Sequence, residues 1–349
     1  MRRLLPVLAA FLLFLPAAQA QQGLAPADAL RMALSDVLDR ASGLGPLKTV
    51  LVAVDGEIVT QRGFRGHSVA APTNIKSASK SIVSALVGIA IDKGVLEGVD
   101  QKIAPLLGGD LPPDPDPRLG EITIGNLLSM QAGLERTSGA NYGRWISSGN
   151  WVRAALARPF VDEPGGAMLY STGSTHLLSA ILSRATGRST LELARDWLGP
   201  LPGFSIAAWE RDPQGIYLGG NQMAMSARSL LAFGELYRNG GRTPDGRQLV
   251  SPDWIALSWQ PRTASRFTGD GYGYGWFQRE IAGHLAHYGW GFGGQMLYVV
   301  PSLGLTIVMT SDPKLPSGGY VRELHALVAE GFVPAAEAMA AAARQAAVR

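Results

Sequence analysis

The sequence predicts an α+β fold in which one antiparallel sheet is assembled from both chain ends and flanked by helices, with a mostly helical insertion at about residues 105–265. Strand-like hairpins near the two ends, at residues 49–64 and 294–310, indicate the sheet. Apolar residues at helical spacing dominate the chain between them. With 349 residues, 46% of them apolar, the chain can bury a large core in one or two domains.

The N-terminal part of the predicted sheet follows a helix. Residues 25–42 carry apolar side chains at roughly helical spacing and end near a glycine. Residues 49–54 and 57–64 are strand-like, and the Asp55-Gly56 pair between them is a hairpin signal. A long apolar run then predicts a helix over residues 77–90, capped or opened by its first residue.

A proline-rich loop at residues 110–120 marks a boundary at the start of the insertion. Helical patterns follow at residues 124–130, 151–157, 175–185, 191–197 and 227–238. Strands return at residues 272–280, 294–300 and 305–310, followed by an amphipathic helix at residues 320–332. The alanine-rich tail, residues 334–349, is compatible with a surface helix or with disorder, so the domain is assigned to residues 21–333.

Residues 1–20 have the pattern of a signal peptide: Arg2 and Arg3, an apolar run, and small residues before a cleavage point. Cleavage there predicts a mature chain that starts at Gln21 and is periplasmic or secreted. The formal charge falls from +3 to +1 without the two arginines, so it gives no support for nucleic-acid binding. No other stretch is long and apolar enough to span a bilayer. The absence of cysteine excludes disulfides, a cysteine nucleophile and thiolate metal sites.

Ser77 and Lys80, three residues apart at the start of the predicted helix, form a candidate nucleophile and base. Residues at this spacing share one helix face, and a lysine buried among apolar neighbours can lose its charge and accept the serine proton. The spacing alone also fits a capped helix with a solvated lysine. A second match, Ser311 to Lys314, contains a proline and reads as a loop.

Four further segments occur in a fixed order after this motif. They read ITIGNLLSMQAGL at residues 122–134, EPGGAMLYST at 163–172, MSARSL at 225–230 and GYGYGW at 271–276. Together they resemble the serine β-lactamase-related family, which groups class C β-lactamases, D-alanyl-D-alanine carboxypeptidases, β-lactamase-fold esterases and 6-aminohexanoate-dimer hydrolases. The resemblance covers nearly all of the mature chain and implies a β-lactamase/transpeptidase-like fold.

The resemblance also implies a catalytic tyrosine beside the serine and lysine. The family carries it in a Tyr-x-Asn motif, and the matching tyrosine here is Tyr170. A phenol in contact with an amine can relay a proton to the leaving group. Thr172 replaces the motif's asparagine, so we expect a substrate contact at that position without a side-chain amide. A literal Tyr-x-Asn at Tyr237 precedes two glycines and reads as a helix end.

The family's third motif, Lys-Thr-Gly or a His-x-Gly variant, is expected in residues 287–291. Either His287 to Gly289 or Gly289-Trp290-Gly291 matches it, and we count His287, Gly289, Trp290 and Gly291 as candidate substrate-binding residues. A glycine there lets the strand approach the acyl group, and a second oxyanion donor is expected from residues 291–293. No lysine is present in this motif, which favours uncharged or differently charged esters and amides.

These observations predict an exported serine hydrolase that cleaves esters, amides or short peptide-like substrates through a Ser-Lys-Tyr acyl-enzyme, without a cofactor or metal. The segments at residues 154–187 and 291–312 are most similar to the esterase and 6-aminohexanoate-dimer hydrolase branch. Two alternatives stay open: a D-alanyl-D-alanine carboxypeptidase or class C-like β-lactamase, and a catalytically silent binding module. His284 and His287 are spaced for a metal, but no third ligand or HExxH motif accompanies them.

Overall fold

The computed structural model describes residues 26–315 and 319–347, so the predicted signal peptide lies outside the described residues. Eight antiparallel strands form the main sheet in the order β2-β1-β11-β10-β9-β8-β7-β6. Their bounds are β1 (Leu47–Val54), β2 (Glu57–Gly63), β6 (Thr263–Ala264), β7 (Gly271–Tyr272), β8 (Phe277–Ile281), β9 (His284–Gly291), β10 (Gln295–Val300) and β11 (Leu305–Ser311).

The sheet joins the two chain ends, as predicted, because β1 pairs with β11 over its whole length, with Val52 opposite Ile307. The strand expected at residues 272–280 is two strands, β7 and β8, separated by a tight turn. Within that turn Gly273 N–H donates to the Trp276 carbonyl at 2.9 Å.

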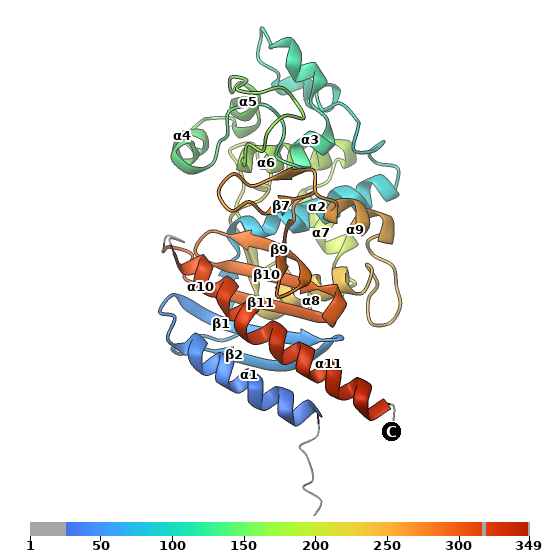
Figure 1. The fold of residues 1–349 in the computed structure, drawn as a ribbon. Coiled ribbons are helices and arrows are strands. Elements are labelled where there is room, and N and C mark those ends of the chain that lie inside the picture. Colours follow the sequence, from blue (N-terminus) through green and yellow to red (C-terminus); the bar gives the residue numbers. More distant parts are fainter. Residues whose placement is uncertain (1–25, 316–318, 348–349) are drawn as a thin grey trace, which may run out of the picture.

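Both faces of the sheet are buried, which explains why its central strands are continuously apolar. Successive residues of β1 enter different cores: Leu51 faces the helical region, and Val52 faces the terminal helices. Figure 1 shows the terminal helices α1 (Pro26–Ser42), α10 (Tyr320–Leu327) and α11 (Val333–Ala347) lying across one face. A π-helical turn, Val328–Phe332, joins α10 to α11. The alanine-rich tail is helical as far as residue 347, the last one that the structure describes, and the start of α11 is buried against the sheet.

The helical region lies beyond the other face of the sheet (Figure 1). Its helices are α2 (Ser79–Asp92), α3 (Ile124–Leu128), α4 (Tyr142–Ile146), α5 (Trp151–Leu156), α6 (Thr172–Thr186), α7 (Thr190–Trp197), α8 (Ala227–Arg238) and α9 (Pro252–Trp259). Short 3-10 turns occupy Lys76–Ala78, Pro105–Asp110, Pro117–Glu121, Gly139–Asn141 and Pro301–Leu303. A small second sheet contains β3 (Pro72–Asn74), β5 (Met223–Ser226) and β4 (Ala208–Trp209).

The helix α2 is the central element of the molecule. Its residues from Ser79 to Ala90 are all buried, since the sheet covers one side and the helices α6, α7 and α9 contact the others. A helix buried on every side carries apolar residues all round rather than one stripe. Among the described residues, none of the helices combines the length and apolar character that a membrane crossing requires.

Candidate active site

Ser77 lies in the 3-10 turn Lys76–Ala78, immediately before α2, and its side chain makes no capping bond to the helix. The expectation that Ser77 caps or opens the α-helix is therefore corrected: α2 begins at Ser79, two residues after Ser77, and its N-cap is Ala78. Lys76 has a φ of 51°, an unfavourable conformation for a residue with a side chain. A strained backbone persists only where the surrounding structure holds it in place, and such residues are concentrated at functional sites.

Lys80 is on the first turn of α2, and its amine reaches back to the serine. Its Nζ atom lies 3.0 Å from Ser77 Oγ and donates to the Gly220 carbonyl at 2.7 Å. The side chain is only 2% exposed. Burial without a carboxylate partner lowers the pKa of Lys80 from 10.5 to about 7, since the charged form loses its water. Near neutral pH a large fraction of the amine is therefore unprotonated and able to accept a proton.

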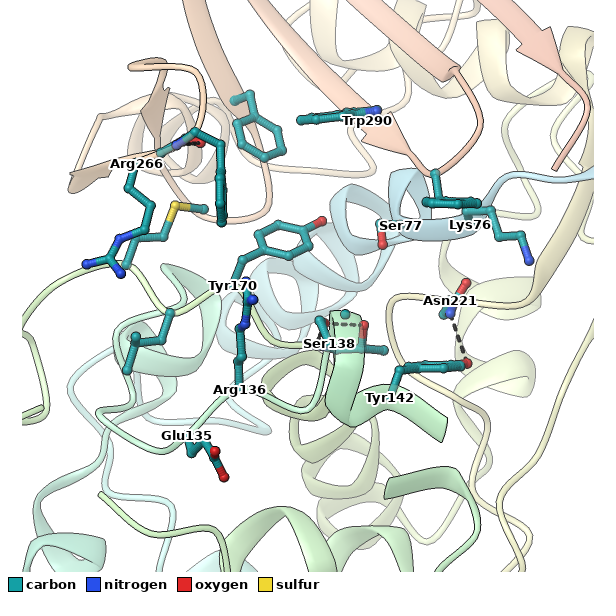
Figure 2. A pocket seen from close by; sticks show the side chains of 18 of the residues that line it. Lys76, Ser77, Glu135, Arg136, Ser138, Tyr142, Tyr170, Asn221, Arg266 and Trp290 are labelled. Carbon is teal, nitrogen blue, oxygen red and sulfur yellow. Dashed lines mark hydrogen bonds between the residues drawn. The ribbon is translucent and has the colours of Figure 1, made fainter. Parts of the chain in front are cut away.

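Tyr170 comes from the segment before α6 and completes the cluster. Figure 2 shows its phenol oxygen pointing toward the Ser77 hydroxyl. The amine of Lys80 lies 4.9 Å from the centre of the tyrosine ring. Burial raises the pKa of Tyr170, so the phenol stays protonated and can donate. The structure thus brings together the three residues that the sequence analysis named as catalytic.

The strand β9 passes directly over the turn that carries Ser77, and its glycines make this contact possible. A Cβ atom on Gly291 would lie 2.1 Å from the Ile75 carbonyl oxygen, and one on Gly289 would lie 3.1 Å from Ser81 Oγ. Of the two matches to the third motif, Gly289-Trp290-Gly291 is the one that lies against the serine turn.

His287 does not line the cavity, so its prediction as a substrate-binding residue is wrong. Side chains alternate along β9, so His287 points to the other face and stacks on Trp259, with ring centres 4.0 Å apart. Burial lowers the pKa of His287 to about 4, which keeps the imidazole neutral in the core. Trp290, on the opposite face of the strand, lines the cavity as expected.

Thr172 lines the cavity, but its polar groups are already engaged. Its hydroxyl lies 3.0 Å from Ser138 Oγ, and its backbone N–H donates to the same oxygen at 2.8 Å. An amide side chain is supplied from elsewhere: Asn221 enters the cavity from the loop after Gly220 and donates to the Tyr142 hydroxyl at 2.9 Å (Figure 2). Sequence analysis missed Asn221, although the two glycines before it were a signal of a close backbone approach.

These residues surround a cavity of about 790 Å³ that opens beside Ser77. Its wall is largely apolar, and three exposed hydrophobic side chains lie at it: Val161, Phe267 and Phe292. Lys76, Arg136 and Arg266 bring positive charge to the same cavity. Within the described part of the chain, neither arginine has a carboxylate within 4.0 Å. The third motif lacks a lysine, but the tertiary structure supplies cations from other segments.

The remaining candidates lie outside the cavity. Tyr237 is 1% exposed and packs on Trp276, with ring centres 4.7 Å apart, so it is a core residue. His284 bonds Ser302 and Glu337 at the surface. Over residues 26–315 and 319–347, no three His, Asp or Glu side chains gather in a way that could hold a metal ion.

The fold and the Ser-Lys-Tyr cluster are those of the β-lactamase-fold serine hydrolases, a class that includes penicillin-binding proteins and esterases. The sequence model described as Beta-lactamase matches residues 43–330, and this chain belongs to the β-lactamase family.

Solved structures with the same fold are distant in sequence. A Bacillus anthracis protein assigned to the 6-aminohexanoate-dimer hydrolases superposes with a TM-score of 0.69 at 20% identity, covering 87% of this chain and 81% of that one. The hydrolase EstCE1, which has promiscuous acyltransferase activity, superposes with a TM-score of 0.69 at 19% identity, covering 86% of this chain and 99% of EstCE1. A penicillin-binding protein homologue of Pyrococcus abyssi superposes with a TM-score of 0.65 at 17% identity, covering 86% of this chain and 76% of the homologue.

A match of higher identity covers only part of this chain. It is 34% identical over 142 residues to a Dichelobacter nodosus protein assigned as fimbrial assembly protein FimD of serogroup H1. The matched region is 39% of this chain and 35% of that protein, so this chain spans about a third of the relative's length. This partial likeness carries no conclusion about fimbriae.

Proposed function

We propose that this chain is an exported serine hydrolase that cleaves ester or amide bonds through an acyl-enzyme on Ser77. The observation that carries the proposal is the 3.0 Å contact between the Ser77 hydroxyl and the buried amine of Lys80, whose pKa of about 7 suits a general base. The predicted signal peptide, residues 1–20, supports export to the periplasm or beyond.

Acylation begins when Lys80 accepts the Ser77 proton and Oγ forms a bond to the substrate carbonyl carbon. The carbonyl oxygen becomes an oxyanion, and collapse of this intermediate breaks the bond to the leaving group. That group needs a proton as it departs. Tyr170 contacts Ser77 and lies beside Lys80, so it can pass the proton from the ammonium to the leaving oxygen or nitrogen. In deacylation, water gives one proton to Lys80 as its oxygen bonds to the acyl carbon. The bond between Ser77 Oγ and that carbon then breaks, the acid product leaves, and Oγ takes up the proton that came from the water.

Two backbone N–H groups are suited to hold the oxyanion. The first belongs to Ser77 at the strained turn. The second is assigned to Phe292, which follows β9 and lies at the cavity. The Gly294 N–H donates to the Gly291 carbonyl at 3.1 Å, so the polar backbone groups of Gly291 face β10. Backbone N–H groups of neighbouring residues in a strand point to opposite edges, so the Phe292 N–H faces the edge of β9 away from β10. The ladder with β8 ends at Tyr288, which leaves that edge open to a substrate.

The esterase and 6-aminohexanoate-dimer hydrolase branch is the best-supported placement within the family. Both the Bacillus anthracis protein and EstCE1 share the fold over more than four-fifths of this chain. The open, largely apolar cavity fits a small molecule with an alkyl or aryl body. Arg136 and Arg266 at its wall have no carboxylate partner among the described residues, which favours substrates that also carry an anionic group away from the scissile bond.

The same cations favour, as a second candidate, a D-alanyl-D-alanine carboxypeptidase or β-lactamase, whose substrates carry a carboxylate. Covalent labelling of Ser77 by a fluorescent penicillin, with hydrolysis of D-alanyl-D-alanine peptides, would support this candidate. Turnover of esters without penicillin labelling would favour the esterase branch.

Intact-protein mass spectrometry after exposure to p-nitrophenyl acyl esters, linear amides and β-lactams tests the proposal directly. We expect an acyl adduct on Ser77 and steady release of p-nitrophenol, and neither in Ser77→Ala. Undiminished turnover in purified Ser77→Ala would exclude the mechanism. The chain would instead be a binding module if two results were found together: no ester, amide, β-lactam or fluorophosphonate labels the wild-type protein, and a ligand raises its melting temperature. Cell fractionation of a chain with and without residues 1–20 tests export.

A further inference from the structure

A histidine and an aspartate form a buried pair behind the active site, on the side away from the cavity. His176 is on α6, and Asp212 is in the loop between β4 and β5. The Nε2 atom of His176 lies 3.0 Å from Asp212 Oδ2, and both side chains are fully enclosed. Neither residue lines the active-site cavity, and the proposed mechanism uses neither of them.

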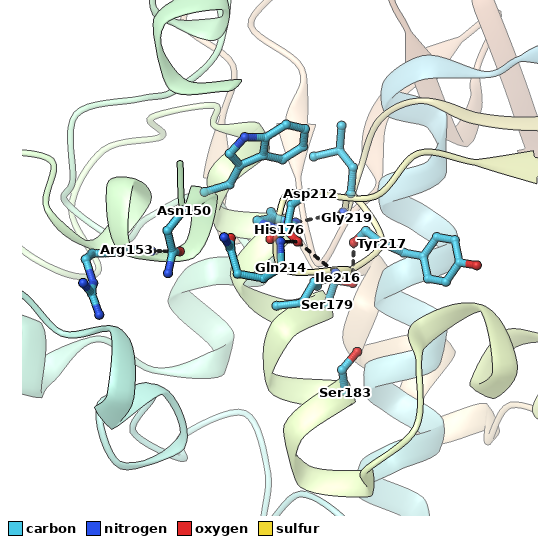
Figure 3. Close-up of polar contacts among 12 residues, drawn as sticks. Asn150, Arg153, His176, Ser179, Ser183, Asp212, Gln214, Ile216, Tyr217 and Gly219 are labelled. Atoms are coloured by element: carbon cyan, nitrogen blue, oxygen red, sulfur yellow. Dashed lines mark hydrogen bonds and ion pairs between the residues drawn. The ribbon is translucent and has the colours of Figure 1, made fainter. Parts of the chain in front are cut away.

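The hydrogen bonds identify which imidazole nitrogen carries the proton. The backbone N–H of Gly219 lies 3.4 Å from Nδ1 of His176, and a backbone N–H can only donate. The Nδ1 atom must therefore accept, so the proton of the neutral ring is on Nε2 and is donated to Asp212. The other carboxylate oxygen accepts from the N–H groups of Gln214 and Ile216, each at 2.8 Å (Figure 3).

Rigid surroundings hold this pair in place. The rings of Trp145 and Trp151 meet the imidazole edge-on, with centres 5.7 and 5.8 Å away. The histidine also shares α6 with Thr172, which begins that helix two residues after Tyr170. The pair thus connects the helix that follows the proposed catalytic tyrosine to the loop at residues 212–220.

That loop leads directly to the catalytic lysine. Gly219 bonds the histidine, and the next residue, Gly220, accepts a hydrogen bond from Lys80 Nζ at 2.7 Å. A Cβ atom on Gly219 would lie 2.2 Å from the Thr175 carbonyl oxygen, so the loop backbone is pressed onto α6. A Cβ on Gly220, whose φ is 77°, would lie 2.7 Å from Lys80 Cγ. The backbone of these two glycines is therefore held by α6 at Gly219 and by Lys80 at Gly220.

We propose that His176 and Asp212 are positioning residues for catalysis: they hold the Gly219–Gly220 backbone so that the Gly220 carbonyl keeps the Lys80 amine beside Ser77. This inference rests on the proposed hydrolase function. The amine has no carboxylate partner among the residues that the structure describes, so the Gly220 carbonyl and the Ser77 hydroxyl are the contacts that orient it. Movement of that carbonyl would turn the amine away from the serine, and displacing a catalytic group by about 1 Å can cost on the order of a hundredfold in rate.

Asp212→Asn separates positioning from support of the fold. The amide oxygen can still accept from Gln214 and Ile216, so the turn at residues 212–216 keeps its hydrogen bonds. The amide nitrogen then donates a proton toward His176 Nε2, so Nε2 must become the acceptor. The ring proton moves to Nδ1, where it points at the Gly219 N–H and replaces a hydrogen bond with repulsion between two donors. The substitution therefore changes the contact to Gly219 while leaving the local packing almost unaltered.

His176→Gln and the double variant complete a mutant cycle. We expect kcat/KM for p-nitrophenyl esters to fall by about tenfold or more in each single variant, with no further fall in the double variant, because both changes break one unit. The limb of the kcat/KM profile that reports Lys80 should move to lower pH, because the ammonium form loses an acceptor that stabilises it.

His325→Gln is the matched control. This half-buried histidine is on α10, and its Nδ1 lies 2.8 Å from the Tyr298 hydroxyl. We expect the control to lower the melting temperature while keeping wild-type kcat/KM and pH profile. The positioning role would be overturned, and the proposed function left intact, by two results together. Asp212→Asn would fold and keep the wild-type kcat/KM and the wild-type pH dependence of kcat/KM, and Ser77→Ala would be inactive. Activity retained in Ser77→Ala would overturn both.

Discussion

The Nζ atom of Lys80 lies 3.0 Å from Ser77 Oγ, although no carboxylate in the described part of the chain pairs with the amine. A lysine enclosed in this way bears the full cost of losing its water when it is charged. The same burial suits it to the proposed role of a base at neutral pH, so the proposed reactivity of Ser77 and the instability of a charged Lys80 have one physical origin.

Ester hydrolysis should increase with pH through the pKa of Lys80, near 7, because only the neutral amine can take the serine proton. The measurement is kcat/KM for a p-nitrophenyl ester between pH 5 and 9, corrected for spontaneous hydrolysis. Lys80→Arg should lose at least about a hundredfold in kcat/KM, since a guanidinium stays protonated across this range. A flat profile below pH 7 would argue against lysine as the base.

Lys80→Met should be more stable than the wild type near neutral pH. Each unit of pKa shift is worth about 1.4 kcal/mol, so a shift from 10.5 to about 7 corresponds to a cost on the order of 5 kcal/mol for the charged form, partly offset by the hydrogen bonds that methionine loses. Between pH 7 and 10.5 the unfolded chain binds a proton at this lysine that the folded chain does not bind. Wild-type stability should therefore rise with pH in that window, and the advantage of Lys80→Met should shrink.

Thermal unfolding of both proteins at pH 7 and pH 9 measures this difference. Subtracting one curve from the other cancels the titration of the groups that the two proteins share. A difference that does not change between the two pH values would contradict the lowered pKa.

Tyr170→Phe should lower kcat for esters and amides by about 10²- to 10⁴-fold, because the hydroxyl that contacts Ser77 is lost while the ring still packs in place. The matched control is Tyr272→Phe. Tyr272 is a neighbouring buried tyrosine whose ring centre lies 6.1 Å from that of Tyr170, and its hydroxyl has no hydrogen-bond partner among the residues with described positions. Equal kinetics in the two variants would remove the proton-transfer role from Tyr170.

Gly291→Ala should inactivate the enzyme while leaving it folded. The added methyl would lie 2.1 Å from the Ile75 carbonyl oxygen, so β9 must move away from the serine turn and carry the Phe292 N–H with it. Loss of one oxyanion donor typically costs 10²- to 10³-fold in kcat. Gly120→Ala meets no atom within 4 Å and should behave as the wild type. Circular dichroism and esterase assays on both variants check this expectation.

Arg136→Gln and Arg266→Gln should each lower kcat/KM two- to fivefold for esters whose acyl chain ends in a carboxylate. The estimate follows from the weak free energy, about 0.2–1 kcal/mol, of a solvent-exposed ion pair. Esters of the same length that end in a methyl group should be unaffected. Arg195→Gln, an exposed arginine on α7 that does not line the cavity, is the control. Equal losses for both kinds of ester would show that the arginines do not select for charge.

Sequence patterns predicted most of the fold because its elements are long and periodic. The strand patterns at both chain ends predicted one shared sheet, and the pairing of β1 with β11 confirms it. The helices α4 and α9 and the small sheet β3-β5-β4 were not predicted. Their elements are two to eight residues long, so a helical or strand period is easily missed in them, although the equally short α3 and α5 were predicted.

The chain order by itself determined that Ser77 and Lys80 lie together, because they are about one helical turn apart and their contact is local. Sequence motifs also pointed to Tyr170, Thr172 and Trp290, but only the tertiary structure decided the rest of the cavity. It turned His287 into the core because β9 alternates its faces, and it carried Asn221 and Arg136 to the cavity from distant loops. The reason is physical: local geometry follows from backbone spacing, whereas contacts between distant segments depend on how the sheet, α2 and α6 pack against one another.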